Sequence, residues 1–258
     1  MTQALIFMHI PKCGGSTLIS ILNRVVPESR RFRLGSDIAG SRMALAALPD
    51  SERLHIDLLY GHLSYGWHEL LFPRQAQYIT IVREPVARVV SHYNFVRSRE
   101  WHYLHSQVVD AKMTLADYVE SGITTEVNDG QVRQISGVED IVQAPYGRSE
   151  VGYGEDHGAL LEKAWENIER HFLLVGLLER FDESVRRLRQ LTGLRIGAYH
   201  AKNVVGPNAA TRFPTPREVD LIRRYNHQDC ELYHRCKEVF ELGVGPAERL
   251  RRLLIGQP

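Results

Sequence analysis

The chain has 258 residues, of which 43% are apolar, and its formal net charge is +1 at neutral pH. The length suits one large α/β domain or two small ones, and the apolar content supports a sizeable core and excludes global disorder. The near-zero charge excludes a general electrostatic attraction to nucleic acid or acidic membranes.

The first part of the chain alternates apolar runs with helical patterns. Residues 4–10 are continuously apolar, which is typical of a buried parallel strand. A Gly-rich turn and a helix that ends near Pro27 follow this strand. Further strands are predicted at 54–62 and 77–82, and the second of these leads into a helix with Pro85 at its first position.

The central part of the chain is predicted to contain two short helices near 114–121 and 128–136, followed by a loop over 137–157. The pattern then indicates a helix at 158–171, a buried strand at 172–178 and a helix at 182–191 that Gly193 closes. A second long loop, 195–213, comes next.

The last predicted helix begins with a strong capping signal. Thr215 suits the N-cap, Pro216 the first turn, and Glu218 the reciprocal position of a capping box. We expect this helix to run to about Phe240. Strands separated by helices predict a single α/β domain over 1–258, with a central parallel sheet and helices on both faces.

Cysteine usage and apolar run lengths indicate the compartment. The three cysteines, Cys13, Cys230 and Cys236, lack paired spacing, which argues against a disulfide scaffold and favours reducing cytosol. No charged leader precedes an apolar stretch, and no run of about 18 apolar residues occurs. We therefore expect a cytoplasmic protein without a membrane span.

The stretch "IPKCGGSTL", residues 10–18, forms the turn between the first strand and its helix. In such a unit, backbone amides of the loop and the first helical turn point at one spot, and the helix dipole adds positive charge there. Gly14 and Gly15 permit close approach of a ligand, Ser16 and Thr17 add hydroxyl donors, and Lys12 adds a charge. The pattern indicates a cradle for phosphate or sulfate; the alternative is a tight structural turn.

Other chemistries for this turn fail on spacing. The nucleoside-triphosphate loop needs Gly-Lys-Ser/Thr after its glycines, and a dinucleotide loop needs separated glycines. A cysteine phosphatase needs an arginine six residues after the cysteine, where this chain has Ile19. Clustered metal ligands are missing around Cys13, so a metal site is not expected.

A second motif, "IVREPVARVVSHYNF", follows the strand at 77–82. Arg83 leaves the strand with a planar guanidinium suited to a phosphate, and Ser91 could reach the same group with its hydroxyl. A surface arginine and a helix serine without a ligand are the alternative.

Together these two motifs resemble those of the sulfotransferases that use 3′-phosphoadenosine 5′-phosphosulfate (PAPS), particularly the branch with heparan and uronyl 2-O-sulfotransferases. That branch carries "HIPK-[TC]-GG-[ST]-[ST]" and "R-[DE]-P-x-x-R-x-x-S-x-Y"; this chain has "HIPKCGGST" at 9–17 and "REPVARVVSHY" at 83–93. The segments "NDGQVRQISG" at 128–137 and "VGLLERFDES" at 175–184 are similar too, as are "HAKNVVG" and "LIRRYNHQDCELY" nearer the C-terminus. The resemblance spans nearly the whole chain.

The resemblance implies a P-loop-like sulfotransferase fold and a role for each matching residue. Lys12 would offset charge on the leaving phosphate, the loop amides would cradle the phosphosulfate, and Arg83 with Ser91 would bind the 3′-phosphate. The implied nucleotide-binding residues are Lys12, Cys13, Gly14, Gly15, Ser16, Thr17, Arg83, Ser91, Lys202 and Asn203. Cys13 stands where many relatives have threonine, and we interpret it as a loop residue rather than a nucleophile.

His62, in "LLYGHLSYGW", is the candidate general base. It follows a predicted strand at the edge where parallel sheets bind ligands, and histidine titrates near neutral pH. The resembling 2-O-sulfotransferases take their base from a Gly-His at this place; their second histidine, just before that glycine, is Tyr60 here. A hydrogen-bonded histidine at a strand end is the alternative, and His68, His92 and Glu84 are rival bases.

The acceptor is a hydroxyl-bearing molecule, for which the resemblance favours a saccharide. Residues 95–105 hold two arginines with interleaved aromatic residues, which suit a sugar or another ring; a solvated helix face with a buried Trp101 is the alternative. Positive charge from Lys12 and the helix terminus makes a divalent metal unnecessary. A small-molecule kinase and a non-catalytic nucleotide-binding protein remain the competing functions.

Overall fold

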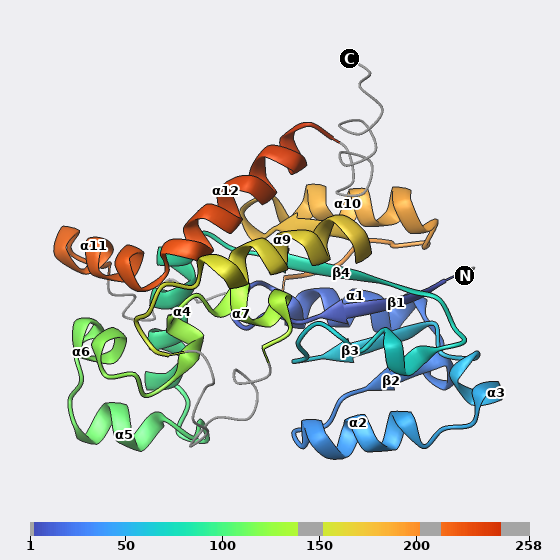
Figure 1. The fold of residues 1–258 in the computed structure, drawn as a ribbon, viewed down its shortest axis with the longest axis horizontal. Coiled ribbons are helices and arrows are strands. Elements are labelled where there is room, and N and C mark those ends of the chain that lie inside the picture. The colour runs from blue at the N-terminus through green and yellow to red at the C-terminus, as the bar shows by residue number, and fades with distance from the viewer. Residues whose placement is uncertain (1–2, 139–151, 202–212, 244–258) are drawn as a thin grey trace.

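The structure is a computed structural model that describes residues 3–138, 152–201 and 213–243 (Figure 1). Its strands are β1 Ala4–Met8, β2 Arg31–Arg33, β3 Leu58–Gly61, β4 Ala76–Val82 and β5 Phe172–Leu177. Its helices are α1 Gly15–Val25, α2 Ile38–Ala46, α3 Asp50–Arg53, α4 Pro85–Arg97, α5 His105–Asp110, α6 Leu115–Glu120, α7 Gly130–Ser136, α9 Gly158–His171, α10 Phe181–Thr192, α11 Pro216–Tyr225 and α12 His227–Glu241. Short 3₁₀ turns lie at Glu28–Arg30, Glu69–Leu71, Thr125–Val127 and Leu178–Arg180.

Within the described ranges the strands form one parallel sheet in the order β2-β3-β1-β4-β5. The central strand β1 pairs with β3 and β4, with Met8 opposite both Gly61 and Thr80. The segments that leave β1, β3 and β4 therefore emerge side by side at one edge of the sheet. The predicted α/β class and parallel sheet are confirmed.

Helices cover both faces of the sheet, as the sequence predicts. On one face, Leu18 of α1 and Leu188 of α10 lie beside Ile81 of β4. On the other, Ile168 of α9 and Val239 of α12 lie beside the neighbouring strand β5. Figure 1 shows α9 and α12 crossing above the strands. Both faces are buried, which explains why the strands are apolar at successive positions.

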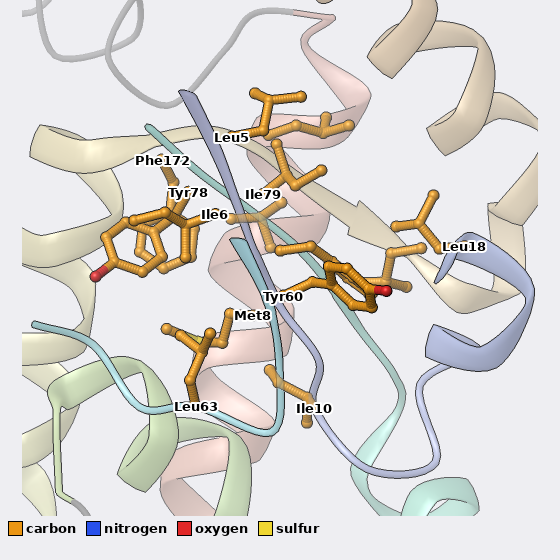
Figure 2. Close-up of a cluster of buried hydrophobic side chains, with 14 of the residues drawn as sticks. Leu5, Ile6, Met8, Ile10, Leu18, Tyr60, Leu63, Tyr78, Ile79 and Phe172 are labelled. Carbon is orange, nitrogen blue, oxygen red and sulfur yellow. The ribbon is translucent and has the colours of Figure 1, made fainter. Parts of the chain in front are cut away.

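The main core lies between the strands and these helices. Figure 2 shows side chains from β1, β3, β4 and β5 in contact, with the rings of Tyr78 and Phe172 side by side. Their centroids are 5.0 Å apart. Leu18 and Ile10, which flank the Gly-rich turn, are both buried in the same cluster, so the turn is anchored by apolar residues on each side.

A second apolar cluster joins α4, α5, α6 and α11 beyond the carboxyl ends of the strands (Figure 1). Its members include Val89 and Tyr93 of α4, Tyr118 of α6 and Ile222 of α11. The cluster supports the helix that follows Arg83, and so it fixes one wall of the region where the strands end.

Local sequence signals predicted the boundaries of most of the expected helices correctly. The capping boxes at Thr114 and Thr215 are both formed, and Gly193 ends α10 in a left-handed conformation with φ 69°. Glu84 caps α4 by accepting a hydrogen bond from the Ala87 amide at 2.7 Å. The short edge strand β2 and the helices α2, α3 and α5 were not predicted.

The prediction of one helix from Pro216 to about Phe240 is wrong, because the chain breaks at Asn226. This residue is buried with φ −128° and ψ 37°. Its side chain donates to the carbonyl oxygens of Val127 at 2.8 Å and Ile222 at 3.0 Å, and it accepts from the Asp129 amide. These tertiary hydrogen bonds outweigh continuation of the helix.

None of the described helices combines the length and apolar character needed to cross a bilayer. All three cysteines are free thiols.

Candidate active site

The Gly-rich turn joins β1 to α1 through two residues with left-handed backbone, Lys12 with φ 67° and Gly14 with φ 78°. At Gly15 the constraint is space, because an added Cβ would lie 1.8 Å from the His9 ring. The glycines are therefore required by backbone angle at one position and by close packing at the next.

The turn leads directly into the N-terminus of α1. Since α1 begins at Gly15, the amides of its first turn lack the carbonyl acceptors that a preceding turn would supply. The Thr17 amide already turns back to the Gly14 carbonyl at 3.1 Å. Alternating left- and right-handed residues at a helix start make a concave anion site. The turn has this backbone pattern at Lys12, Gly14 and the start of α1, and the anion cradle itself stays a prediction.

Lys12 brings a positive charge to this turn in an unusual environment. Its Nζ lies 3.7 Å from the centroid of the Phe95 ring, a cation–π contact. Burial, with a smaller contribution from the neighbouring Arg83, lowers the pKa of Lys12 to about 8. The ammonium is thus weakly solvated, and a bound anion would restore its charge.

Arg83 lies against the same turn, since its Nη1 donates to the Lys12 carbonyl at 3.1 Å. Gln131 of α7 fixes the backbone of Arg83: its Oε1 accepts from the Arg83 amide at 2.9 Å, and its Nε2 donates to the Arg83 carbonyl at 3.0 Å. The same Gln131 Oε1 receives the Cys13 thiol at 3.6 Å. Burial raises the pKa of Cys13 to about 12, so this thiol is a poor nucleophile.

The other predicted nucleotide-binding residues are Ser91, Lys202 and Asn203. Ser91 is half-buried on α4, two turns after Arg83. Lys202 and Asn203 lie outside the described residues. The structure therefore brings together Lys12, the Gly-rich turn and Arg83, and within the described residues Ser91 makes no hydrogen bond to this group.

His62 follows β3 directly and faces the turn. The pairing of Met8 with Gly61 sets His9 beside His62, and their rings stack with centroids 4.2 Å apart. His62 Nδ1 donates to the His9 carbonyl at 2.9 Å. The residue is open to the cleft, but surrounding protein desolvates its ring enough to lower the pKa, while the hydrogen bond to His9 raises it. At neutral pH the ring is uncharged, with the lone pair on Nε2.

A cleft of about 680 Å³ contains both Lys12 and His62. It is lined by His9, Pro11, Lys12, Ser16, Ile19, Arg33, Leu34, Gly35, Ser36, Ile38, Tyr60, Gly61, His62, His92, Phe95, Trp101, His102, Tyr103, Glu126 and Gln134. Lys12 and Ser16 of the Gly-rich turn and the uncharged His62 therefore line one cavity at the carboxyl edge of a parallel sheet, where such folds bind ligands.

Comparisons with known proteins identify the family of the chain. The sequence profile of the Sulfotransferase family matches residues 1–234. The chain belongs to the sulfotransferase family. It is 24% identical to the human and the mouse uronyl 2-sulfotransferase over 266 aligned positions, covering 92% of this chain. It spans 62% of the length of these two proteins. A crystal structure of mouse sulfotransferase SULT7A1 complexed with PAP is similar with a TM-score of 0.47 and 14% identity, over 92% of this chain and 89% of that one.

The rival bases are arranged differently in this member of the sulfotransferase family. His68 is not among the residues lining the cleft; it packs against Tyr78 and the ring of His171. Glu84 is engaged as the cap of α4. His92 does line the cleft, but it is buried and its Nδ1 is 2.9 Å from the Tyr118 hydroxyl. His62 is exposed at the cleft, and within the described residues its Nε2 makes no hydrogen bond.

Trp101 forms part of the cleft wall rather than of the core. It is 73% exposed, which contradicts the alternative of a buried Trp101. The turn after α4 carries it beside His102 and Tyr103, and its ring meets that of Phe95 edge-on at 5.7 Å. Phe95, Trp101, His102 and Tyr103 thus form an aromatic wall of the cleft.

Glu126 lies in the 3₁₀ turn Thr125–Val127 and lines the cleft, and no sequence pattern predicted it. Burial raises the pKa of this carboxyl to about 7, although the charges of Arg88 and Lys12 oppose the shift. Only the raised pKa and the position, neither readable from a single sequence, mark it as a candidate functional residue.

Arg88, the second arginine of "REPVAR", has a supporting role. Its side chain is 1% exposed and lies 3.3 Å from Asp229, which is fully buried on α12. Arg88 also donates to the Glu126 carbonyl at 2.5 Å. Asp229 in turn accepts from the Val132 amide at 2.8 Å. This ion pair ties α4, α7 and α12 together behind the cleft. In the described part of the chain, no three histidine, cysteine or acidic residues cluster as a metal site would require.

Proposed function

We propose that the protein transfers a sulfuryl group from PAPS to a hydroxyl of a carbohydrate acceptor, with His62 as the general base. The observation that carries the proposal is the cleft that Lys12 and Ser16 of the Gly-rich turn share with the uncharged His62. The similarity to proteins named uronyl 2-sulfotransferase supports the carbohydrate acceptor.

The residues of the turn fit a phosphosulfate. Gly14 has a left-handed backbone angle, Gly15 lets the turn pack closely against the His9 ring, and the Lys12 ammonium is already poorly solvated. Arg83, which touches the same turn, would bind the 3′-phosphate together with Ser91. When bound, PAPS supplies the sulfuryl group and a phosphate leaving group.

The histidine is arranged to accept a proton. Because Nδ1–H is donated to the His9 carbonyl, Nε2 carries the lone pair and is the atom that takes the proton of the acceptor hydroxyl. Lys12 stabilises charge that develops on the leaving phosphate oxygen. The two residues therefore act on opposite ends of the transfer, one on the nucleophile and one on the leaving group.

Two substitutions test this division. His62→Ala should retain affinity for PAP and lose turnover by about 10²–10⁴-fold, as for a removed general base. Lys12→Ala should lose both turnover and nucleotide affinity, because its charge meets the ligand before reaction. His68→Ala, a half-buried histidine outside the cleft lining, is the matched control.

Stabilisation in thermal unfolding is the first readout. PAP should raise the midpoint temperature of unfolding, whereas ATP with magnesium should not. Stabilisation by ATP with magnesium but not by PAP would favour a kinase. PAP binding with no turnover on any saccharide would favour a non-catalytic nucleotide-binding protein. If His62→Ala turns over at the wild-type rate, the base lies elsewhere, and His92 would be examined next.

A further inference from the structure

Gln134 of α7 holds both segments of chain that surround His62. Its Nε2 donates to the Leu63 carbonyl at 2.7 Å and to the His9 carbonyl at 3.2 Å. Its own backbone carbonyl accepts from the Tyr65 amide at 3.0 Å. One residue therefore ties the segment that leaves β1 to the segment that carries His62 away from β3.

The His9 carbonyl connects Gln134 to the ring of His62. This oxygen accepts from Gln134 Nε2 and also from His62 Nδ1, which lies 2.9 Å away. A carbonyl oxygen has two lone pairs, so it can accept from both donors at once. The orientation of the Gln134 amide follows from the same contacts, because its oxygen in place of Nε2 would face two carbonyl oxygens.

The hydrogen bond to His9 decides which nitrogen of His62 can act as a base. A histidine side chain in water favours the tautomer with its proton on Nε2. A carbonyl that accepts from Nδ1 selects the other tautomer and leaves the lone pair on Nε2. A carbonyl that was free to turn away would lose this selection. Gln134 restrains that carbonyl, and its bond to Leu63 restrains the backbone on the other side of the same histidine.

The helix that carries Gln134 is itself firmly held. Every residue of α7 is buried, and Asp229 of α12 and Asn167 of α9 both hydrogen-bond its backbone, at 2.8 Å and 3.0 Å. Gln131, one helical turn earlier, holds the backbone of Arg83 in a similar way. Gln134 lines the cleft but is fully buried, so it acts through the two carbonyls that it binds and not by touching a ligand.

We infer that Gln134 is a positioning residue: through the His9 and Leu63 carbonyls it keeps His62 in the tautomer and orientation in which Nε2 can take the proton of the acceptor hydroxyl. This inference rests on the proposed function. It makes α7 the support of both parts of the site, with Gln131 on the nucleotide side and Gln134 on the side of the base.

The tautomer of His62 can be measured directly, without turnover. Long-range ¹H–¹⁵N NMR of the PAP-bound protein, labelled with ¹⁵N-histidine, distinguishes a protonated ring nitrogen from an unprotonated one. The spectra are recorded at about pH 7.5, where the ring of His62 is uncharged, and His62→Ala identifies its signals. Sulfuryl transfer from PAPS to a saccharide panel that includes methyl β-glucuronide is followed by mass spectrometry. The wild type should carry the His62 proton on Nδ1.

Gln134→Met keeps the length of the side chain and removes its amide. It should give a mixture of both His62 tautomers and lower turnover by about 10–100-fold, as when a group that orients a histidine is lost. Its affinity for PAP should change by less than about threefold, because the nucleotide lies on the other side of the site. Gln134→Asn, whose amide is one methylene too short to reach both carbonyls, should show the same changes at smaller size.

Gln131→Met is the matched control, since Gln131 is equally buried one turn away on the same helix. It should weaken PAP by about three- to tenfold, because the backbone of Arg83 loses the hydrogen bonds that Gln131 makes to it. It should leave the tautomer of His62 unchanged.

Three results would overturn the inference. The first is an unchanged His62 tautomer in both Gln134 variants when these still bind PAP. The second is the same change of tautomer in Gln131→Met. The third is wild-type turnover in Gln134→Met while His62→Ala is inactive. Failure of the proposed function looks different: PAP gives no thermal shift, or His62→Ala sulfates a saccharide at the wild-type rate, while the tautomer of His62 still responds to Gln134→Met.

Discussion

The lowered pKa of Lys12 predicts that the affinity for the nucleotide falls as pH rises from 7 to 9. In the free protein, burial and Arg83 reduce this pKa to about 8 from an ordinary value of 10.5. A phosphate beside the ammonium would return the pKa to at least its ordinary value, since an opposite charge favours the protonated form. Binding then takes up a proton whenever the free lysine is neutral.

The size of the effect follows from linkage between the two protonation states. Below pH 7 Lys12 is charged in both free and bound protein, so affinity does not vary through this residue. As pH rises through 8, the free protein loses the proton that the complex keeps, and affinity falls. With these pKa values, the dissociation constant of PAP should rise about tenfold between pH 7 and pH 9.

Calorimetric titration of PAP at several pH values measures this change directly. At pH 9, comparison of two buffers with different ionisation enthalpies should show uptake of nearly one proton. Lys12→Met should bind more weakly and lose most of the slope between pH 7 and pH 9; ionisation of Glu126 and of the phosphate groups of PAP accounts for residual slope near pH 7, and Glu126→Gln should remove the Glu126 part. A wild-type affinity that is constant from pH 7 to pH 9 would refute the reasoning.

Three further substitutions test the remaining parts of the site. Arg83→Ala should weaken PAP by roughly 2–4 kcal/mol in calorimetry, as for a lost charge-assisted pair, and barely affect adenosine 5′-phosphosulfate, which lacks the 3′-phosphate; equal losses for both ligands would contradict the assignment. Cys13→Thr should keep turnover, and the wild-type thiol should resist iodoacetamide at neutral pH because burial raises its pKa to about 12; inactivity of a folded Cys13→Thr protein would count against this. Asp229→Asn leaves Arg88 buried without its charge partner and should lower the free energy of unfolding by about 3–5 kcal/mol in urea titration, whereas a change under about 1 kcal/mol would show the pair to be dispensable.

Features set by neighbouring residues were predictable from the sequence, and those set by distant contacts were not. The Gly-rich turn, the caps at Thr114 and Thr215 and the position of His62 after β3 all follow from short-range patterns. The strand β2 is three residues long with arginine at both ends, so it carries no apolar run to detect. Its assignment depends on pairing with β3, a contact that local sequence does not encode.

The break at Asn226 and the role of Glu126 have the same origin. Asn226 interrupts a pattern that favours helix because its side chain is engaged by Val127 and Asp129, about a hundred residues earlier in the chain. Glu126 lies in a segment with no helical or strand period, and its backbone is held by a hydrogen bond from Arg88 of α4. Both residues act through contacts between α4, the turn before α7 and the C-terminal helices.

The pairing of β1 with β3 positions both parts of the proposed chemistry, the general base His62 and the cation Lys12. Pairing of Met8 with Gly61 places His9 beside His62, and the His9 carbonyl then fixes which nitrogen of His62 carries the proton. Three residues later the same segment supplies Lys12 to the anion cradle, and the His9 ring fills the space that a side chain at residue 15 would need. A shift of one strand against the other would therefore move the base and the cradle relative to each other. The buried, apolar faces of both strands prevent such a shift, since a one-residue slip would turn every core side chain to the opposite face. The register of the core thus sets the distance over which the sulfuryl group would be transferred.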